Sequence, residues 1–479
     1  MRFTYSLILI TLLAFSAKAQ SANEVWSLQR CVQYALDHNI SIRQNVLNER
    51  LAALTLKQSR LSQLPNANIA PGYGRSYGRS VDPTTNQFVS GSYDFLSLGG
   101  NADVLLFGWF QRRNTILKND LNHQAAIADL DQLRDDVSLN IATGYLRALL
   151  AKEQIRVNEK QVALSQEQLL QTQKFAEAGR VPQINVSQLT SQVATDSANL
   201  ITAISDYTAS LLDLRALLNL DFEVPFEVQA PDVPLQDQYA LLAHTPQEIY
   251  TVAAQKFGAI RSSDLKLKAT EKGLKAAKGA LYPQLALNAQ LGSSYATTYK
   301  DYGTPVITGT APTGSYVDVS GQQYLIYQPT YTLPITRTTP LNTQFSDNFR
   351  HTYSLNLSIP IFNAWQAQAA VRQARISMES QQLNKDQASL TLKQNVYKAY
   401  NDARNSIQKY YAAKRAAEAA EEAFSYAQKR YETGLTNTVE YLTIQNNQYR
   451  ADATLSSAKY DLIFRLKVID YYLGNQLKL

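Results

Sequence analysis

The sequence predicts a mainly α-helical protein with a β-barrel part, built as two tandem repeats of helix, β-hairpin, long helix and shorter return helix. Three observations predict this fold. The chain of 479 residues matches itself at two constant offsets, short segments alternate apolar with uncharged polar residues, and two helical segments are unusually long. An internal repeat of this length indicates that one structural unit occurs twice.

The repeats are defined by two alignments of the chain with itself. One offset aligns residues 27–74 with 245–292, and a second aligns 101–220 with 356–475. The segment between the aligned blocks is much longer in the second copy, so the two copies differ mainly in one loop. The predicted parts are a signal peptide at 1–19, repeat 1 at 20–220, a proline-containing connector at 221–246 and repeat 2 at 247–479.

Each repeat is expected to contain the same four elements. The first helices show apolar residues at helical spacing and end at Pro65 and Pro283. Each long helix would span about 105 Å at 1.5 Å per residue. In the first of them, predicted core positions such as Ile155, Val162 and Leu169 follow coiled-coil spacing. The expected elements are a helix at 27–64, a hairpin at about 66–107, a long helix at about 109–178 and a return helix at about 181–219, then a helix at 247–282, a hairpin at about 284–362 with a long loop at 293–350, a long helix at about 364–433 and a return helix at about 436–474.

The first nineteen residues have the composition of a signal peptide. Arg2 supplies a positive start, residues 7–15 are nearly all apolar, and Ala17-Lys18-Ala19 fits a cleavage site before Gln20. A membrane anchor is the alternative, but the run is shorter than the roughly 20 residues that span a bilayer. The sequence therefore predicts an exported protein.

Composition excludes several classes of protein. A single cysteine, Cys31, cannot form a disulfide framework within the chain. The net charge of +6 comes from no Lys/Arg-dense block, so no nucleic-acid partner is expected. The 29 tyrosines, together with abundant Gln, Asn, Ser and Thr, indicate much polar but uncharged surface.

The predicted strands have one apolar and one uncharged polar face. In the second hairpin Leu285, Leu287 and Leu291 alternate with residues such as Asn288 and Gln290. This pattern is typical of a transmembrane β-barrel with a wet lumen. A soluble sheet with one solvated face is the alternative, although it would usually carry Lys and Glu. Four strands cannot close a barrel in lipid, whereas a homotrimer supplies twelve strands and leaves room for a channel.

Aromatic residues follow each hairpin. They are Phe107 and Trp109 after the first, and Phe362 and Trp365 after the second. We expect them at the membrane interface with the outer-membrane lipid, where aromatic girdles lie. Burial in an ordinary protein core is the alternative.

The mature chain resembles the TolC-type outer-membrane efflux proteins over essentially its whole length. The motifs that carry the resemblance are Leu-Pro65 and Tyr-Pro283 before the strands, Leu106-Phe107-Gly108 and Pro360-Ile361-Phe362-Asn363 after them, and Tyr431-Glu-Thr-Gly434-Leu-Thr-Asn-Thr-Val-Glu440-Tyr-Leu442. The resemblance implies a trimer in the outer membrane of a Gram-negative bacterium, with a twelve-stranded β-barrel continued by a periplasmic α-helical barrel. It also implies a passive duct for substrates of an inner-membrane pump, reached through a periplasmic adaptor, in tripartite efflux or type I secretion.

The resemblance also implies site residues. Gly179-Arg180 and Gly434-Leu435 are similar to the tip at which the adaptor docks, although glycines there also serve as ordinary helix C-caps. Glu440 matches a carboxylate that constricts the pore, and a ring of three would favour cations; a solvated surface Glu is the alternative. Thr443 and Asn185 stand where the family has further acidic residues, which puts a strong acidic gate in doubt.

No pattern in the sequence indicates catalysis. The four histidines are scattered, and no HExxH, CxxC, phosphate-binding loop or nucleophile elbow occurs. We therefore expect no enzyme activity, no metal and no cofactor. The alternative function is a non-transport role, either a periplasm-spanning coiled-coil scaffold or a surface receptor that uses the loop at 293–350.

Overall fold

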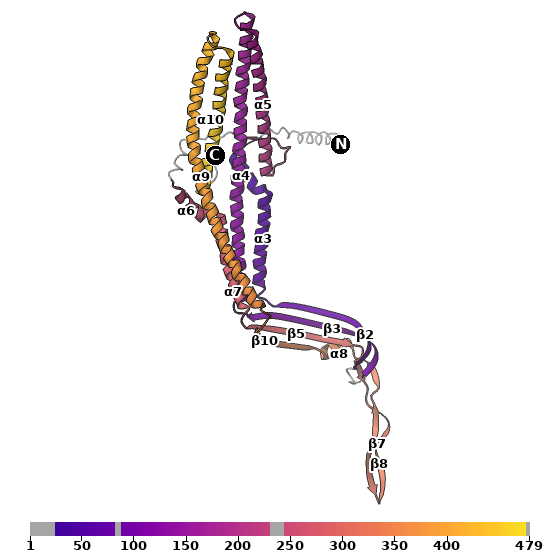
Figure 1. The fold of residues 1–479 in the computed structure, drawn as a ribbon. Coiled ribbons are helices and arrows are strands. Elements are labelled where there is room, and N and C mark those ends of the chain that lie inside the picture. The colour runs from indigo at the N-terminus through magenta and orange to yellow at the C-terminus, as the bar shows by residue number, and fades with distance from the viewer. Residues whose placement is uncertain (1–23, 82–87, 230–243, 476–479) are drawn as a thin grey trace, which may run out of the picture. The chain divides into compact units, whose positions relative to one another are not determined.

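The computed structural model describes residues 24–81, 88–229 and 244–475 (Figure 1). The predicted signal peptide at 1–19 and most of the connector at 221–246 lie outside the described residues. The chain forms two compact units. Of the described residues, unit 1 contains 24–55, 118–229, 244–271 and 376–475, and unit 2 contains 56–81, 88–117 and 272–375.

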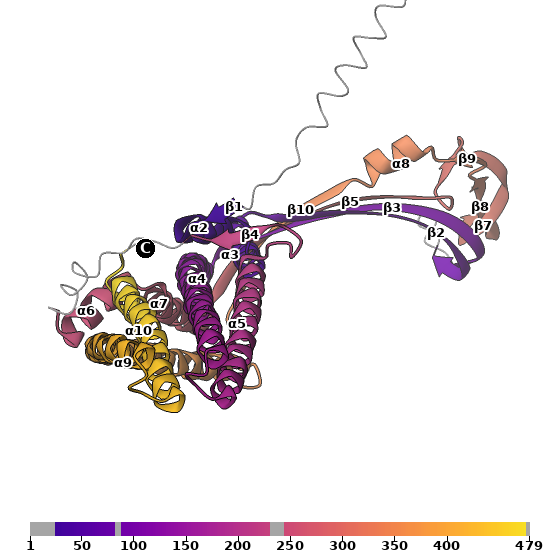
Figure 2. The same cartoon turned by 90° about the horizontal axis from the view of Figure 1, so that it is seen from above.

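Unit 1 consists mainly of two long helical hairpins. In Figures 1 and 2, α4 lies beside α5 and α9 lies beside α10. The long members, α4 (Gln111–Glu177) and α9 (Gln366–Glu432), have 67 residues each. The other elements are α5 (Gln183–Leu218), α10 (Thr438–Tyr472), α2 (Leu28–His38), α3 (Ile40–Leu61), α6 (Pro246–Lys256), α7 (Gly258–Gly279) and the parallel strands β1 (Glu24–Trp26) and β4 (Phe226–Val228).

The first helix of each repeat is interrupted, which corrects the predicted continuous helices at 27–64 and 247–282. The breaks are at Asn39 and Phe257, whose backbones are extended and whose N–H groups donate to the carbonyls of Ala35 and Ala253 at 2.8 Å. The side-chain oxygen of Asn39 then accepts from the backbone of Ser41 at 2.9 Å and caps α3. Hydrophobic periodicity alone does not reveal such a break, because the apolar spacing continues across the interrupted residue.

The apolar core of unit 1 repeats with the sequence. In the first copy Cys31, Ala35 and Ile141 are buried in one cluster that includes α2 and α4. In the second copy the aligned residues are buried in another cluster: Ile249, Ala253 and Val396. Equivalent positions therefore form equivalent cores, which confirms the predicted two-repeat architecture. Burial also raises the pKa of the Cys31 thiol to about 12.

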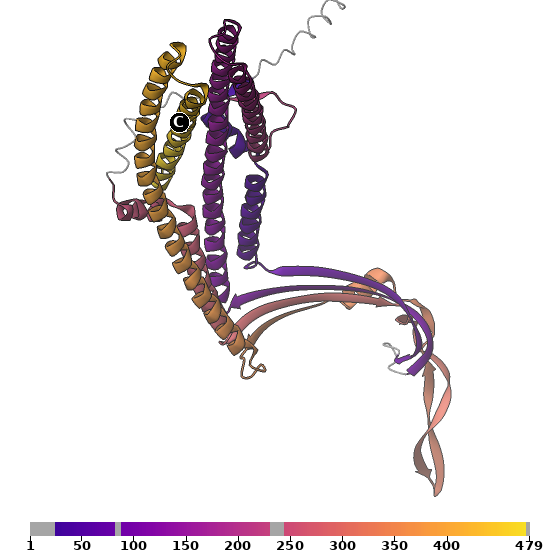
Figure 3. The same cartoon turned by 45° about the horizontal axis from the view of Figure 1, so that its top comes forward.

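Unit 2 is built on one antiparallel sheet with the strand order β10-β5-β3-β2. Its strands are β2 (Asn66–Val81), β3 (Phe88–Phe107), β5 (Gln284–Ala296) and β10 (Arg350–Ser358), and they curve together along their length (Figure 3). Pairs such as Leu287 with Leu355 lie on one face, and pairs such as Asn288 with Ser354 lie on the other. The predicted alternation therefore produces one apolar and one polar face. Strands β2 and β10 form the two edges.

The predicted long loop at 293–350 is largely strand. It contains β6 (Lys300–Tyr302), β7 (Val306–Val319), β8 (Gln322–Thr332), β9 (Ile335–Thr338) and the short helix α8 (Leu341–Asp347). Strands β7 and β8 form a hairpin, here called the arm, with a turn at Ser320 and Gly321 in left-handed conformation. Prolines and glycines suggested a loop, but the β-branched and aromatic residues between them have high strand propensity.

Among the described residues, no helix is both long enough and apolar enough to span a bilayer.

Candidate functional site

The turns at the ends of the two helical hairpins have the same geometry. Gly179 and Gly434 follow α4 and α9 with φ of +72° and +76°. In each turn the N–H groups bond back to the last helical turn: Arg180 to the carbonyl of Phe175, and Leu435 to that of Arg430, both at 2.8 Å. This is the Schellman arrangement, in which glycine adopts a left-handed conformation without steric cost. The C-cap interpretation of both glycines is therefore correct at the level of structure.

A cavity of about 330 Å³ brings the two turns together. Its lining includes Arg180 and Asn185 from the first hairpin, and Gly434 and Leu435 from the second. The Arg180 guanidinium lies 4.5 Å from the ring centroid of Phe175, another lining residue, so its planar face is covered while its charge stays at the surface. Four of the predicted tip and constriction residues therefore share one site.

The other predicted constriction residues, Glu440 and Thr443, lie outside this lining. They occupy the first turns of α10, which Asn437 caps by accepting from the backbone of Glu440 at 2.9 Å. Glu440 is exposed and lies 3.7 Å from the guanidinium of Arg430. The hydroxyl of Thr443 donates to the carbonyl of Val439 at 2.8 Å. Within one chain the structure therefore does not bring Asn185, Glu440 and Thr443 into one cluster.

Between the hairpins, the tipward half of α4 is buried through polar side chains. These residues, here called the polar seam, are Asn158, Gln161, Ser165, Gln168 and Thr172. Hydrophobic spacing does not predict them, because it places the core at Ile155, Val162 and Leu169. Those three side chains are only half-buried. The polar residues also follow steps of three and four, so their spacing was the available signal.

The polar seam holds α4 against α5 and α10 by hydrogen bonds. Asp196 of α5, which is 2 % exposed, accepts from Ser165, from Gln161 at 3.2 Å and from Gln192 at 2.8 Å. On α10, Gln445 donates to Ser165 at 3.4 Å. Three side-chain donors therefore satisfy the buried oxygens of Asp196, and among the described residues no Lys, Arg or His forms an ion pair with it.

Two tyrosines extend this network toward the turns. Tyr431 bonds to Thr172 at 2.9 Å, and Gln168 donates to the hydroxyl of Tyr441. The two tyrosine rings are stacked with centroids 4.6 Å apart. Burial, followed by the nearby Tyr431 and acidic residues, raises the pKa of Tyr441. The hydroxyl is neutral at physiological pH and accepts from Gln168.

The predicted interface aromatics lie where strands of unit 2 pass into helices. A register shift between Leu105 and Phe107 places Phe107 opposite Leu285, on the apolar face of the sheet. The ring centroids of Phe107 and Trp109 lie 5.7 Å apart, and those of Trp109 and Tyr282 lie 4.6 Å apart. In the second copy Phe362 is 86 % exposed, and the guanidinium of Arg372 lies 5.0 Å from the Trp365 ring. These side chains are surface aromatics, not core residues.

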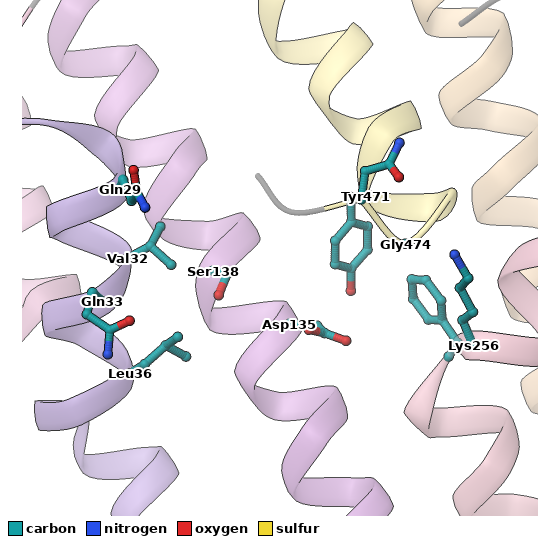
Figure 4. A pocket seen from close by; sticks show the side chains of 11 residues that line it. Gln29, Val32, Gln33, Leu36, Asp135, Ser138, Lys256, Tyr471 and Gly474 are labelled. Carbon is teal, nitrogen blue, oxygen red and sulfur yellow. The ribbon is translucent and has the colours of Figure 1, made fainter. Parts of the chain in front are cut away.

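A second cavity, of about 580 Å³, lies within unit 1 between α2, α4 and the end of α10 (Figure 4). Figure 4 shows Asp135, Tyr471 and Lys256 around it. Lys256 donates to the carbonyl of Leu473 at 2.9 Å, and Tyr471 donates to Asp136 at 3.1 Å. Asp135 is exposed to solvent, but the protein around it desolvates its carboxyl and raises its pKa, and the charges of Asp136 and Asp131 add to this effect.

The four histidines are engaged separately. His123 bonds to Glu49 at 2.7 Å, and His244 lies 3.7 Å from Glu248. His38 stacks on Tyr34, and His351 lies beside the Tyr353 ring. Among the described residues, no group of three or more His, Cys, Asp or Glu side chains is placed so that it could hold a metal ion.

This architecture is shared with solved outer-membrane channels. The outer membrane protein VceC from Vibrio cholerae is similar with a TM-score of 0.73 and 15% identity, over 94% of this chain and 97% of that chain. The sequence matches the family described as outer membrane efflux protein over residues 31–220 and 250–475. Because these ranges contain most of the residues, the chain belongs to the outer membrane efflux protein family.

Curated relatives agree with this assignment. TolC from Escherichia coli is 22% identical over 473 residues, covering 98% of this chain and 85% of TolC. The toxin and drug export protein A from Aggregatibacter actinomycetemcomitans is 20% identical, covering 92% and 86%. The protein is thus an outer-membrane protein that extends into the periplasm, in a family of efflux channels and not of enzymes.

Proposed function

We propose that three copies of this chain form a duct through the outer membrane. The observation that carries the proposal is the four-stranded sheet with unpaired edges at β2 and β10. Lipid does not tolerate open edges, and four strands are too few to close a barrel. Pairing of β2 with β10 of the next copy closes a twelve-stranded barrel and leaves no edge.

The two faces of the sheet fit the two environments of such a barrel. The face with Leu287 and Leu355 would contact lipid, and the face with Asn288 and Ser354 would line the lumen. Phe107, Trp109, Phe362 and Trp365 would meet the headgroups at the periplasmic boundary. Conduction through this wet lumen is passive, because the energy comes from an inner-membrane pump.

The helical hairpins would continue the duct into the periplasm as an α-helical barrel. The cavity between their turns supplies a docking site for a periplasmic adaptor. Leu435 is 70% exposed, and Arg180 adds a cation. Gly179 and Gly434 keep both turns short enough for a partner helix to approach. The adaptor would connect this tip with the inner-membrane pump.

Glu440 is the proposed constriction, together with Thr443 and Asn185. One carboxylate from each of three copies would form an acidic ring that attracts cations. Its ion pair with Arg430 links this ring to α9. Thr443 and Asn185 add polarity without charge, so the ring is weaker than one with several carboxylates in each chain.

Planar lipid bilayers provide the test. The purified trimer is expected to give discrete conductance steps with a preference for cations, and Glu440→Gln is expected to reduce that preference. Glu422→Gln, an exposed position on α9, is the matched control and leaves the preference unchanged. The variant Arg430→Ala removes the ion pair with Glu440. If homogeneous trimers of both the wild-type protein and this variant fail to conduct, the proposal is refuted.

A further inference from the structure

Strand β2 contains a short internal repeat that neither the fold nor the proposed duct requires. Residues 73–80 read Tyr-Gly-Arg-Ser twice. Successive side chains of a strand alternate between faces, so Tyr73, Arg75, Tyr77 and Arg79 share one face. These four residues are here called the Tyr–Arg row.

The register places the Tyr–Arg row on the apolar face of the sheet. Tyr73 pairs with Leu96 of β3, and Leu96 pairs with Tyr295 of β5. On the same face of β3, Phe107 pairs with Leu285 near the helices. The row therefore continues the apolar face toward the end of β2 that lies farther from α3.

The distance along the strand fits a membrane. A bulge before Phe107 adds one residue to β3, so the stretch from Phe107 to Leu96 matches Leu285 to Tyr295 of β5 and advances about 33 Å at roughly 3.3 Å per residue. At a tilt near 40°, this corresponds to roughly 25 Å of height, which matches the apolar band of about 25 Å in transmembrane barrels. Tyr73 therefore lies at the edge of the band opposite Phe107, and Arg75 and Arg79 lie beyond it.

Both arginines are held by rings. The guanidinium of Arg79 lies 4.3 Å from the ring centroid of Phe88, and that of Arg75 lies 6.0 Å from that of Tyr77. Arg75 also pairs with Asp94 at 3.2 Å. Within the described part of the chain, no carboxylate forms an ion pair with Arg79. A guanidinium stacked on a ring keeps its N–H edge free for an acceptor.

We propose that the Tyr–Arg row binds the phosphate groups of outer-leaflet lipid headgroups. Tyrosine is enriched at membrane boundaries, where its ring is apolar and its hydroxyl is wet. Arginine binds phosphate through two parallel hydrogen bonds. Alternation of the two side chains on one strand places a phosphate-binding group directly above an aromatic anchor. The inference rests on the proposed function, because it takes the apolar face to contact lipid.

The test uses the full-length protein in detergent and a bisphosphorylated lipid A as probe. Bound lipid is counted by native mass spectrometry, and dephosphorylated lipid A and inorganic phosphate serve as separate arms. Arg75→Gln/Arg79→Gln is expected to bind the phosphorylated lipid on the order of thirtyfold more weakly than wild type. Arg79→Gln alone leaves the Arg75–Asp94 pair intact and is expected to show about fivefold weaker binding.

Arg350→Gln is the matched control, because Arg350 lies in the same sheet on the polar face and should leave binding unchanged. Equal binding of phosphorylated lipid A by wild type and both Tyr–Arg variants would overturn the inference. Equal binding of the dephosphorylated lipid would also overturn it, as would binding of inorganic phosphate as tight as that of the phosphorylated lipid. Conductance measurements distinguish a failure of the lipid-binding proposal from a failure of the proposed duct. A double variant that conducts normally but binds the lipid as tightly as wild type contradicts the lipid-binding site alone.

Discussion

The two halves of α4 are buried by different chemistry at the same helical spacing. From Ala125 to Leu149 the buried residues are almost all apolar, including Ile141 and Tyr145. From Asn158 to Thr172 they are all polar. Apolar contacts are non-directional and tolerate small shifts, whereas hydrogen bonds are made only in a narrow range of geometry. The apolar half therefore anchors the unit, and the polar seam specifies one register near the tip.

This difference suggests where the helices can rearrange. A polar seam that loses its register can exchange its partners for water, but an apolar core that opens loses buried area. We therefore expect any change in helix packing to be easier beside the polar seam than beside Ile141. Five substitutions test this comparison.

The largest effect is expected from Ile141→Ala. Ile141 is 1% exposed, and its truncation removes apolar contacts and leaves a cavity, at a cost of about 2–5 kcal/mol. The measurement is the midpoint of unfolding followed by helical circular dichroism. Ile155→Ala, at a half-buried position of the same helix, should cost less. An equal loss for both would show that the apolar half is not the anchor.

Asp196→Ala is expected to come next. It removes the acceptor of Ser165, Gln161 and Gln192, and a buried donor left without a partner costs about 1–3 kcal/mol. Water that enters the seam offsets part of this cost. Asp206→Ala, an exposed position on the same helix, should stay within about 0.5 kcal/mol in the same unfolding assay. No difference between the two variants would contradict a structural role of the carboxylate.

Tyr441→Phe removes one hydrogen bond and keeps the ring stack. The donor on Gln168 loses its partner, at a cost of about 1 kcal/mol. Because this contact joins α4 to α10 near the turns, we expect longer open times in bilayer recordings as well as a lower unfolding midpoint. Tyr426→Phe, at an exposed position of α9, should change neither quantity.

Gly434→Ala tests the turn itself. A Cβ at this position would meet no atom within 4 Å, so the cost comes from the left-handed backbone and is about 1 kcal/mol. Gly434→Asn should cost less, because asparagine tolerates this conformation. The unfolding midpoints of the two variants provide the comparison. If alanine and asparagine were equivalent, backbone strain would not be the cause.

The smallest effect on stability is expected from a substitution of Asp135, which lies on the exposed side of the apolar half of α4. Because the folded state raises the pKa of Asp135, the protonated form contributes stability that is present below the ordinary value of 3.8 and is lost as the pH rises through the raised pKa. Asp135→Asn should therefore raise the free energy of unfolding at pH 7 by less than about 0.5 kcal/mol. This gain in stability should disappear in acid. Asp131→Asn removes an ion pair with Arg134 and should give no gain. A gain at pH 7 that persists in acid would contradict the assigned cause.

The sequence predicts the fold well where the pattern is long. Repeat matching identifies residues that form equivalent cores, such as Ala35 and Ala253, because apolar burial is written in the spacing. Spacing does not predict the break at Asn39 or the strands of the arm. The break depends on local hydrogen bonds, and the strands of the arm depend on their pairing with each other. The tip glycines are found from motifs, and the left-handed φ explains why glycine stands there.

The polar seam shows the limit of periodicity. Gln161 and Ser165 have the spacing of core residues, but polar residues in a long helix are normally interpreted as surface. Their burial depends on Asp196 and Gln445, which belong to other helices and approach only in the folded chain. Partners of this kind are set by tertiary contacts, which a single sequence does not reveal.

The arm has one further consequence, for proteolysis. Between Lys300 and Arg337 the chain contains neither lysine nor arginine. Trypsin therefore has no cleavage site within β7 or β8, however exposed their side chains are. On intact cells, a barrel that presents the arm outside would release residues 301–337 as one peptide, after cleavage at both ends. The arm contains no basic residue, and Asp318 is its one charged side chain. Release of this single peptide by trypsin therefore shows on which side of the membrane the arm lies.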